Sequence, residues 1–212
     1  TLPWNLDEDQ VTLGIGVFAG EEGWTGGTRL PVTDAGGLPV LEDGTLVRLG
    51  GFERTADGQW QPRAAVPPAY ATQPAQQIDA RFGDAIFLLE SSAPPSSRAG
   101  ATLPLHLRWK RTAAAPPNLS RFVHVLDAAG NKVAQVDGQV TDAFGPLPAA
   151  SWPDTMPVDD LMMIDLPVTL APGEYTVIAG MYDWQTGERL PAAGTAARPD
   201  GAAQLGTIRI ME

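Results

Sequence analysis

Residues 159–191 read DDLMMIDLPVTLAPGEYTVIAGMYDWQTGERLP, and this stretch decides the fold class. It holds two strand-like runs, Leu161–Val168 and Tyr175–Tyr182, which a Pro-Gly pair at 172–173 separates. Proline fixes φ and glycine permits positive φ, so the pair predicts a turn. The sequence Asp-Trp-Gln-Thr-Gly at 183–187 predicts a second turn, with its glycine in the left-handed conformation.

The run Tyr175–Tyr182 is apolar on both of its faces. Alternate positions place Val177 and Met181 on one face and Ile178 and Tyr182 on the other. A strand with one wet face would alternate between apolar and polar residues. We therefore expect this strand to lie in the middle of a sheet and to be covered on both sides.

The start of the chain resembles the same stretch. The segments align in the same order: Val11–Phe18 with Tyr175–Tyr182, a loop around Trp24 with one around Trp184, Thr28–Pro31 with Glu188–Pro191, and Gly44–Leu46 with Gly206–Ile208. Few residues are identical, but their order and chemistry agree. We interpret this as an internal repeat, and chance similarity between two glycine-broken strands is the alternative.

The N-terminal copy lacks the further strands, about 95 residues, that precede the C-terminal copy. Three explanations remain open: the chain is cut from a longer protein, the N-terminal hairpin docks onto the C-terminal domain as extra strands, or two chains complete each other. The first residue, Thr1, is consistent with a processed or excised chain. Unpaired strand edges favour aggregation, so docking within one chain is the preferred interpretation.

The composition of the 212-residue chain is typical of many short strands joined by tight turns. The 23 glycines and 20 prolines fall between short apolar runs, and 43% of the residues are hydrophobic, which is enough for a core. A net charge of −11 without a basic stripe argues against nucleic acid as a partner. The absence of cysteine excludes zinc-thiolate sites. No run approaches the roughly 20 apolar residues that span a bilayer, so we expect no membrane insertion.

The order of these features predicts three parts. Residues 1–53 are expected to form an N-terminal β-hairpin element, 54–78 a linker rich in alanine and proline, and 79–212 a β-sandwich domain. Further strands are expected at 84–90, 103–110, 121–127, 132–136 and 206–211. Seven or more short strands without a helix predict an all-β fold, an antiparallel β-sandwich of Ig-like or jelly-roll-like type.

Three motifs resemble one known family. They are F-V-H-V-L-D-x-x-G-x-x-V-A-Q-x-D at 122–137, Ser-Trp-Pro at 151–153, and L-A-P-G-E-Y-T-V…G-M-Y-D-x-x-T-G-E-R-L-P at 170–191. This set resembles the C-terminal, extracytoplasmic β-sandwich domain of large bacterial, Chloroflexi-like membrane proteins of the glycosyltransferase and mannosyltransferase type. The resemblance covers about 80–212, and 11–49 only as a partial copy.

That resemblance implies a sandwich fold and a place outside the cytoplasm, at the cell surface or in a periplasm-equivalent space. It assigns no catalytic residue to this domain, so any transferase activity would belong to the parent protein. We therefore expect a non-enzymatic domain without cofactors. The partners expected are a polysaccharide or another cell-envelope protein.

The two histidines carry different expectations. His124 shares a strand face with Phe122 and Leu126, so it is interpreted as a core or boundary histidine. His106 lies with Arg108 on the polar face of 103–110, whose other face is apolar. Neither histidine has the spacing of a zinc site. The acidic residues at 7–9 and 159–160 lack the alternating acidic loop with glycine of a calcium site, so no metal is predicted.

The tryptophans are the best functional signal. Trp24, Trp152 and Trp184 lie in predicted loops, and two exposed indoles on one rim would suit the apolar faces of sugars. The candidate ligand-binding residues are therefore Trp152, Trp184, Trp24, His106 and Arg108. If the rings instead fold back onto the sandwich, the chain is a structural or protein-interaction module.

The leading prediction is a non-catalytic extracytoplasmic accessory domain of a cell-envelope protein that binds a glycan or a partner. A structural or interaction module is the second hypothesis, and the solvent exposure of Trp152 and Trp184 separates these two. The third is a hydrolase, because 25 acidic residues leave room for a carboxylate pair that spacing alone does not reveal.

Overall fold

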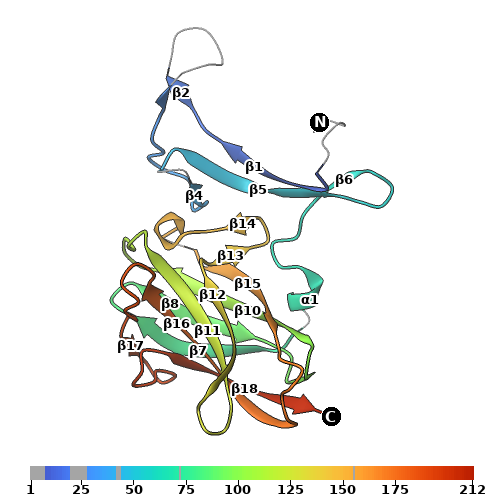
Figure 1. Cartoon of the computed structure of the whole chain (residues 1–212). Helices are drawn as coiled ribbons and strands as arrows, with labels where there is room; N and C mark the ends of the chain where they lie inside the picture. The colour runs from blue at the N-terminus through green and yellow to red at the C-terminus, as the bar shows by residue number, and fades with distance from the viewer. Residues whose placement is uncertain (1–7, 20–27, 42–43, 72, 155) are drawn as a thin grey trace.

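The computed structural model describes residues 8–19, 28–41, 44–71, 73–154 and 156–212 (Figure 1). The regular secondary structure of the described residues is almost entirely β-strand, and most of it forms one two-layered sandwich. The strands of the sandwich are β7 (Ala75–Phe82), β8 (Ile86–Ser92), β9 (Ser96–Arg98), β10 (Thr102–Arg111), β11 (Leu119–Leu126), β12 (Lys132–Gly138), β15 (Val158–Asp165), β16 (Gly173–Asp183), β17 (Ala192–Ala193) and β18 (Ala203–Met211).

Two five-stranded sheets form the layers. The first has the order β15-β10-β8-β7-β17 and the second has the order β12-β11-β16-β18-β9. Neighbouring strands run antiparallel, except for β9, which pairs parallel to β18. The predicted antiparallel β-sandwich is thus confirmed.

The core lies between the sheets and follows the alternation of the strands. On β10, Leu103, Leu105 and Trp109 are at most 1% exposed, as their period of two predicts. On β16, Val177 and Met181 point into the same core. The strand lies between β11 and β18, so its predicted central position is confirmed.

The opposite face of β16 is also covered. Ile178 packs there with Phe122, Leu126 and Ala202 in a second apolar cluster on the outer side of the sheet. Gly180 contributes by its lack of a side chain, because a Cβ at this position would overlap the Phe122 ring. The chain after β16 returns over this face, since Gly201 lies beside Gly180 and Arg189 lies over the Phe122 ring, which explains why the strand is mostly apolar on both faces.

Several shorter elements lie in regions expected to be irregular. The region 139–157, expected as a loop, holds β13 (Thr141–Asp142), β14 (Gly145–Pro146) and the 3-10 turn η1 (Ala149–Ser151). The expected linker 54–78 holds β6 (Trp60–Pro62) and α1 (Pro68–Ala71), and its end is part of β7. The first strand of the sandwich therefore begins at residue 75 and not at 79.

The N-terminal element forms its own sheet. Strand β5 (Leu46–Arg54) pairs with β1 (Gln10–Ile15), with β4 (Val40–Leu41) and with β6, and a separate hairpin joins β2 (Phe18–Ala19) to β3 (Thr28–Arg29). None of these described strands extends either sheet of the sandwich. The element instead lies against the β13–β14 hairpin of the same chain (Figure 1). Docking in cis therefore occurs, but not through extra strands as expected.

The two hairpins that the predicted repeat equates have the same pairing. Phe18 pairs with Arg29, and the equivalent residues Tyr182 and Arg189 form an isolated bridge. The hydrogen bond that follows is also equivalent: Leu30 N donates to Val17 O at 2.8 Å, and Leu190 N donates to Met181 O at 2.9 Å.

The repeat does not extend to the pairing with the next strand. In the C-terminal copy Tyr175 pairs with Ile208. The sequence alignment equates Tyr175 with Val11 and Ile208 with Leu46, so the same pairing would join Val11 to Leu46. Val11 pairs with Phe52 instead. The N-terminal copy thus keeps the hairpin, but β1 pairs with β5 in a different register. A bulge shifts this register between Leu13 and Gly14.

Candidate functional site

The structure separates the predicted tryptophans. Trp152 follows η1 and is 1% exposed; its indole nitrogen donates a hydrogen bond to Leu147 O at 2.9 Å, and its ring lies 6.3 Å from that of Trp109. This ring fills the core, so Trp152 is not part of a glycan-binding rim. Trp184 is 54% exposed, and Trp24 lies outside the described residues.

The exposed Trp184 sits on a well-held turn. The Asp183 carboxylate accepts hydrogen bonds from the backbone nitrogens of Gln185 and Thr186 at 2.8 and 3.3 Å. The backbone nitrogen of Trp184 donates to Asn118 O at 3.1 Å, and the Asn118 amide also donates to Asp183. The turn after β16 therefore presents a single indole ring from a fixed backbone.

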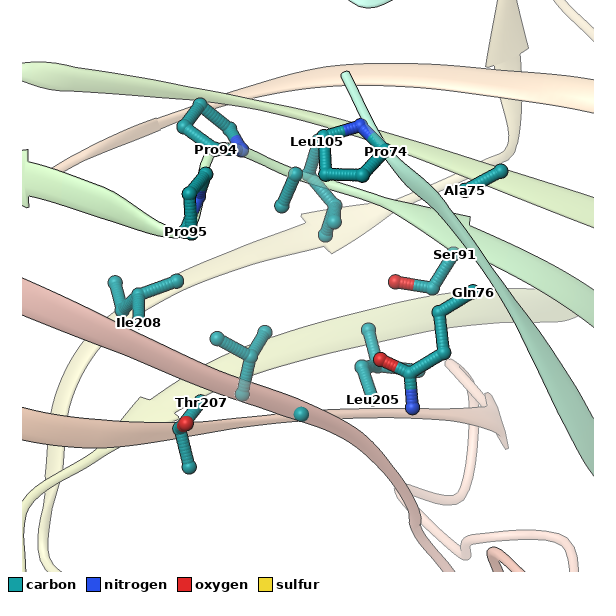
Figure 2. A pocket seen from close by; sticks show the side chains of 13 residues that line it. Pro74, Ala75, Gln76, Ser91, Pro94, Pro95, Leu105, Leu205, Thr207 and Ile208 are labelled. Atoms are coloured by element: carbon teal, nitrogen blue, oxygen red, sulfur yellow. The ribbon is translucent and has the colours of Figure 1, made fainter.

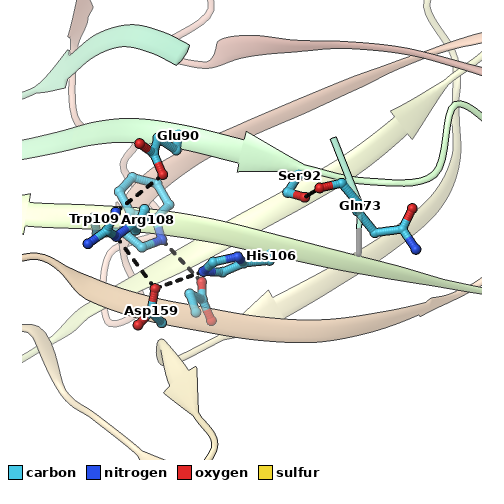
Figure 3. Close-up of polar contacts among 8 residues, drawn as sticks. Gln73, Glu90, Ser92, His106, Arg108, Trp109 and Asp159 are labelled. Carbon is cyan, nitrogen blue, oxygen red and sulfur yellow. Dashed lines mark hydrogen bonds and ion pairs between the residues drawn. The ribbon is translucent and has the colours of Figure 1, made fainter. Parts of the chain in front are cut away.

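His106 and Arg108 are brought together on the outer face of the first sheet (Figure 3). His106 Nε2 lies 2.8 Å from Asp159 Oδ1, and Arg108 Nε lies 3.6 Å from the same oxygen. Arg108 Nη1 also donates to Glu90 Oε2 at 3.4 Å. The pKa of Glu90 is lowered, chiefly by the amide of Gln77 that donates to it and also by Arg108.

This polar cluster pairs opposite charges across three strands. Ser92 is the cross-strand neighbour of His106, but its hydroxyl donates to Gln73 O at 3.1 Å, so the two do not form a nucleophile and base (Figure 3). The sequence pattern indicates neither Asp159 nor Glu90 as part of this cluster. Strand register places both residues opposite Arg108, Asp159 on β15 and Glu90 on β8. No spacing along the chain reveals that register.

The next residue, Asp160, points the opposite way, into the core. It is fully buried, and its carboxylate accepts hydrogen bonds from Trp109 Nε1 at 3.2 Å, Arg121 Nε at 3.1 Å and the backbone nitrogen of Thr141 at 3.0 Å. Burial raises the pKa of Asp160, and Arg121 opposes that effect. Because β15 and β11 belong to different sheets, the pair ties the two layers together.

A cavity of about 190 Å³ opens between the sheets at the β7 and β18 side (Figure 2). Leu105, Leu205 and Ile208 form its apolar part, and Gln76 and Ser91 add polar atoms. A second cavity of about 280 Å³ lies between residues 32–40 and 150–154. Among the described residues, no group of three acidic or histidine side chains could hold a metal ion, and no helix is long and apolar enough to cross a membrane.

The N-terminal sheet meets the sandwich through its polar face. The Phe144 ring covers Gly51, where a Cβ would lie 2.7 Å from the ring, and the guanidinium groups of Arg48 and Arg63 lie 5.7 and 5.2 Å from its centroid. Thr12 Oγ1 donates to Phe144 O at 3.0 Å, and Arg48 forms an ion pair with Asp142. This contact uses small and polar side chains of β1 and β5.

The opposite face of the same sheet is apolar and faces solvent. Cross-strand pairs place Val11 beside Phe52 and Ile15 beside Val47, on the side away from Phe144. Leu13, Ile15 and Val17 are 40%, 54% and 61% exposed. We call Val11, Leu13, Ile15, Val47 and Phe52 of this sheet, with the neighbouring Val17 and Leu30 outside it, the outer face. The sheet thus buries Arg48 and Gly51 on its polar face and leaves Leu13 and Ile15 exposed on its apolar one.

No family model and no curated protein sequence matches the chain. Among solved structures, a CARDB domain from Pyrococcus furiosus, in complex with di-metal ions, is similar to it. That comparison has a TM-score of 0.33 at 10% identity and covers 62% of this chain and 93% of that chain. A likeness at this level carries no argument about function.

Proposed function

We propose that the chain is a non-catalytic interaction module, and that the outer face of its N-terminal sheet is the surface that binds a partner protein. The observation that carries this proposal is that the sheet turns its polar face toward the sandwich and leaves apolar side chains exposed on its outer face. Exposed apolar surface costs about 25 cal/mol for each Å². A contiguous apolar face on an otherwise polar surface marks an interaction site.

The internal repeat supports this proposal. The alignment equates Leu13, Ile15 and Val17 with Val177, Ala179 and Met181 of β16. The residues of β16 are 3%, 0% and 1% exposed, because they face the opposing sheet of the sandwich. The same pattern of side chains is therefore covered by a β-sheet in one copy and lacks a cover from the described residues in the other.

The resemblance to extracytoplasmic sandwich domains supports a place for this module in the bacterial cell envelope. In that setting the sandwich would act as a rigid body that positions the N-terminal sheet. The Phe144 contact holds the sheet to the sandwich through its polar side, which leaves the outer face turned away and accessible.

Site-specific photo-crosslinking tests the proposal. A benzophenone side chain at Ile15 is expected to form a discrete adduct with a protein in the native cells. The matched control is the same group at Val168, which is 80% exposed and lies outside the outer face. If position 15 gives no adduct, or gives the same products as position 168, the outer face is not a binding surface and the proposal fails.

A second candidate function, glycan binding, is favoured by one observation, the exposed indole of Trp184 on its fixed turn. A tryptophan fluorescence titration against bacterial and plant polysaccharides tests it. Binding would give a saturable shift that Trp184→Ala removes and that Trp60→Phe retains. A flat response in the wild-type chain would rule out this second candidate.

A further inference from the structure

We infer that the outer face binds the outer face of a second copy of this chain, so that the two N-terminal sheets pack face to face in a two-fold symmetric dimer. The inference rests on the proposed function, since it names the partner of the same surface. In such a dimer the sheet of one copy would cover the outer face of the other, as the opposing sheet of the sandwich covers β16.

The repeat indicates what kind of surface fits. In the C-terminal copy, Val177 and Met181 meet an opposing sheet, and its side chains facing them are apolar, for example Leu105 and Leu107. Two sheets that pack in this way lie about 10 Å apart and interdigitate their inner side chains. A partner for Leu13, Ile15 and Val17 therefore has to present a sheet face with aliphatic side chains.

The chain itself carries such a face. Beyond the N-terminal element, the exposed large hydrophobic side chains of the described residues lie singly, as Met163, Val168 and Met211 do. The outer face gathers four such side chains, Leu13 and Ile15 on β1 and Val17 and Leu30 beside it. A second copy is thus the one partner of known composition that offers a matching surface, and a surface that binds itself produces a two-fold dimer.

Charge favours the same arrangement. Each chain carries a net charge of −11, so most contacts between two copies would bring like charges together. The outer face has no ionisable side chain among its seven residues, and the acidic cluster and ion pairs lie on other surfaces. These seven side chains can therefore meet those of a second copy without burying a charge of their own, while Arg54, on the same side of β5 as Phe52, lies over the Trp60 ring at the end of the strand.

A surface the size of the outer face is typical of weak, transient interfaces. Seven partly exposed apolar side chains offer on the order of 500 Å² for each copy, or on the order of 1,000 Å² in total, which lies at the lower end of specific interfaces. We therefore expect a reversible dimer with a dissociation constant in the micromolar range, and not a permanent one.

Sedimentation velocity from about 1 to 200 μM, a range set by that interface size, tests the inference on the full chain. The wild-type chain is expected to shift from monomer to dimer, and Ile15→Asp is expected to weaken dimerisation at least about tenfold. Val168→Asp, the matched control, should dimerise like the wild type. A wild-type chain that stays monomeric over this range, or a dimer that Ile15→Asp leaves unchanged, overturns the inference.

A spin-label measurement covers the case in which Ile15→Asp disturbs the sheet. The chain has no cysteine, so Ile15→Cys and Val168→Cys each accept a single nitroxide. Double electron–electron resonance should give a short, defined distance for the label at 15 and a longer or undefined one at 168. A monomer that still forms an adduct with another protein at position 15 would overturn this inference and leave the proposed function standing.

Discussion

Gly180 and Gly16 occupy equivalent positions of the repeat but face different surroundings. A Cβ on Gly180 would overlap the Phe122 ring, which belongs to a packed cluster, and lie 2.9 Å from Gly201 O. A Cβ on Gly16 would lie 3.2 Å from Thr45 O and otherwise meet ordinary contacts. Close packing therefore requires glycine at position 180, whereas position 16 has more room for a side chain.

We predict that Gly180→Ala lowers the free energy of unfolding by about 1–3 kcal/mol or more, because the added methyl group forces the Phe122 ring and the backbone apart. Gly16→Ala is the matched control and should change stability much less. Urea unfolding followed by circular dichroism measures both. Equal losses in the two variants would contradict the packing difference.

The buried pair of Asp160 and Arg121 is a second constraint at the residue scale. Asp160→Ala would leave the Arg121 guanidinium buried without its partner, which is expected to cost about 3–5 kcal/mol. Replacing both, as Asp160→Leu with Arg121→Met, removes the two charges together and should restore part of that loss, because the Trp109 indole and the Thr141 backbone nitrogen still lose their acceptor. A double-mutant cycle in urea measures the coupling; additive losses would show that the pair does not act as a unit.

At the scale of elements, the strands with a clear period were predictable and the others were not. β10 alternates Leu with His or Arg, and residues 175–182 of β16 are mostly apolar on both faces, so both were predicted with the correct burial. β7 begins Ala-Gln-Gln, and its polar outer residues gave it the composition of a linker, so its start was placed too late. Composition describes a segment, whereas membership in a sheet depends on partners far along the chain.

The candidate site shows the same limit. The sequence pattern predicted His106 and Arg108 together from their alternation, and they do lie in one cluster. It could not find Asp159 or Glu90, because only the register of three strands brings them there. It also could not tell that Trp152 is buried and Trp184 exposed, since a loop residue can fold onto the core or away from it.

The contact between the N-terminal sheet and the sandwich belongs to this scale as well. Phe144→Ala removes the ring that lies on Gly51 and between two guanidinium groups, each contact of that kind being worth about 0.5–1 kcal/mol. We predict that amide exchange in β1 and β5 becomes about tenfold faster, since about 1.4 kcal/mol corresponds to tenfold, while the β10 and β16 amides keep their protection.

The control for this prediction is Phe18→Ala, which removes an exposed aromatic ring from the same element, 5.5 Å from the Arg29 guanidinium, but outside the contact. Hydrogen exchange with mass spectrometry resolves the two regions. If Phe144→Ala loosens the sandwich strands as much as β1 and β5, then the N-terminal sheet and the sandwich form one cooperative unit.

At the scale of the whole molecule, His124 links stability to pH. It is 9% exposed, stacks 4.9 Å from the Phe122 ring, and lies 3.6 Å from Asp137. Its pKa is lowered, first by burial and then by Lys132, with Arg189 acting in the same direction and Asp137 opposing it. The folded chain therefore takes up this proton less readily than the unfolded chain does.

The sign of the effect follows from that difference. The stability associated with the neutral His124 is present above the unfolded pKa of about 6.5. It is lost as the pH falls from there toward the folded pKa, because the unfolded state then binds more protons. One such proton contributes a slope of at most about 1.4 kcal/mol per pH unit.

We predict that the free energy of unfolding of the wild-type chain decreases between pH 7 and pH 5.5, and that His124→Gln has a smaller slope over this range. Glutamine can keep a polar contact with Asp137 but takes up no proton, so any loss of packing shifts its stability curve without changing its pH dependence. Urea midpoints at several pH values, for both proteins, give the two slopes. Equal slopes would mean that other groups govern the response of this acidic molecule to pH and that the burial of His124 does not.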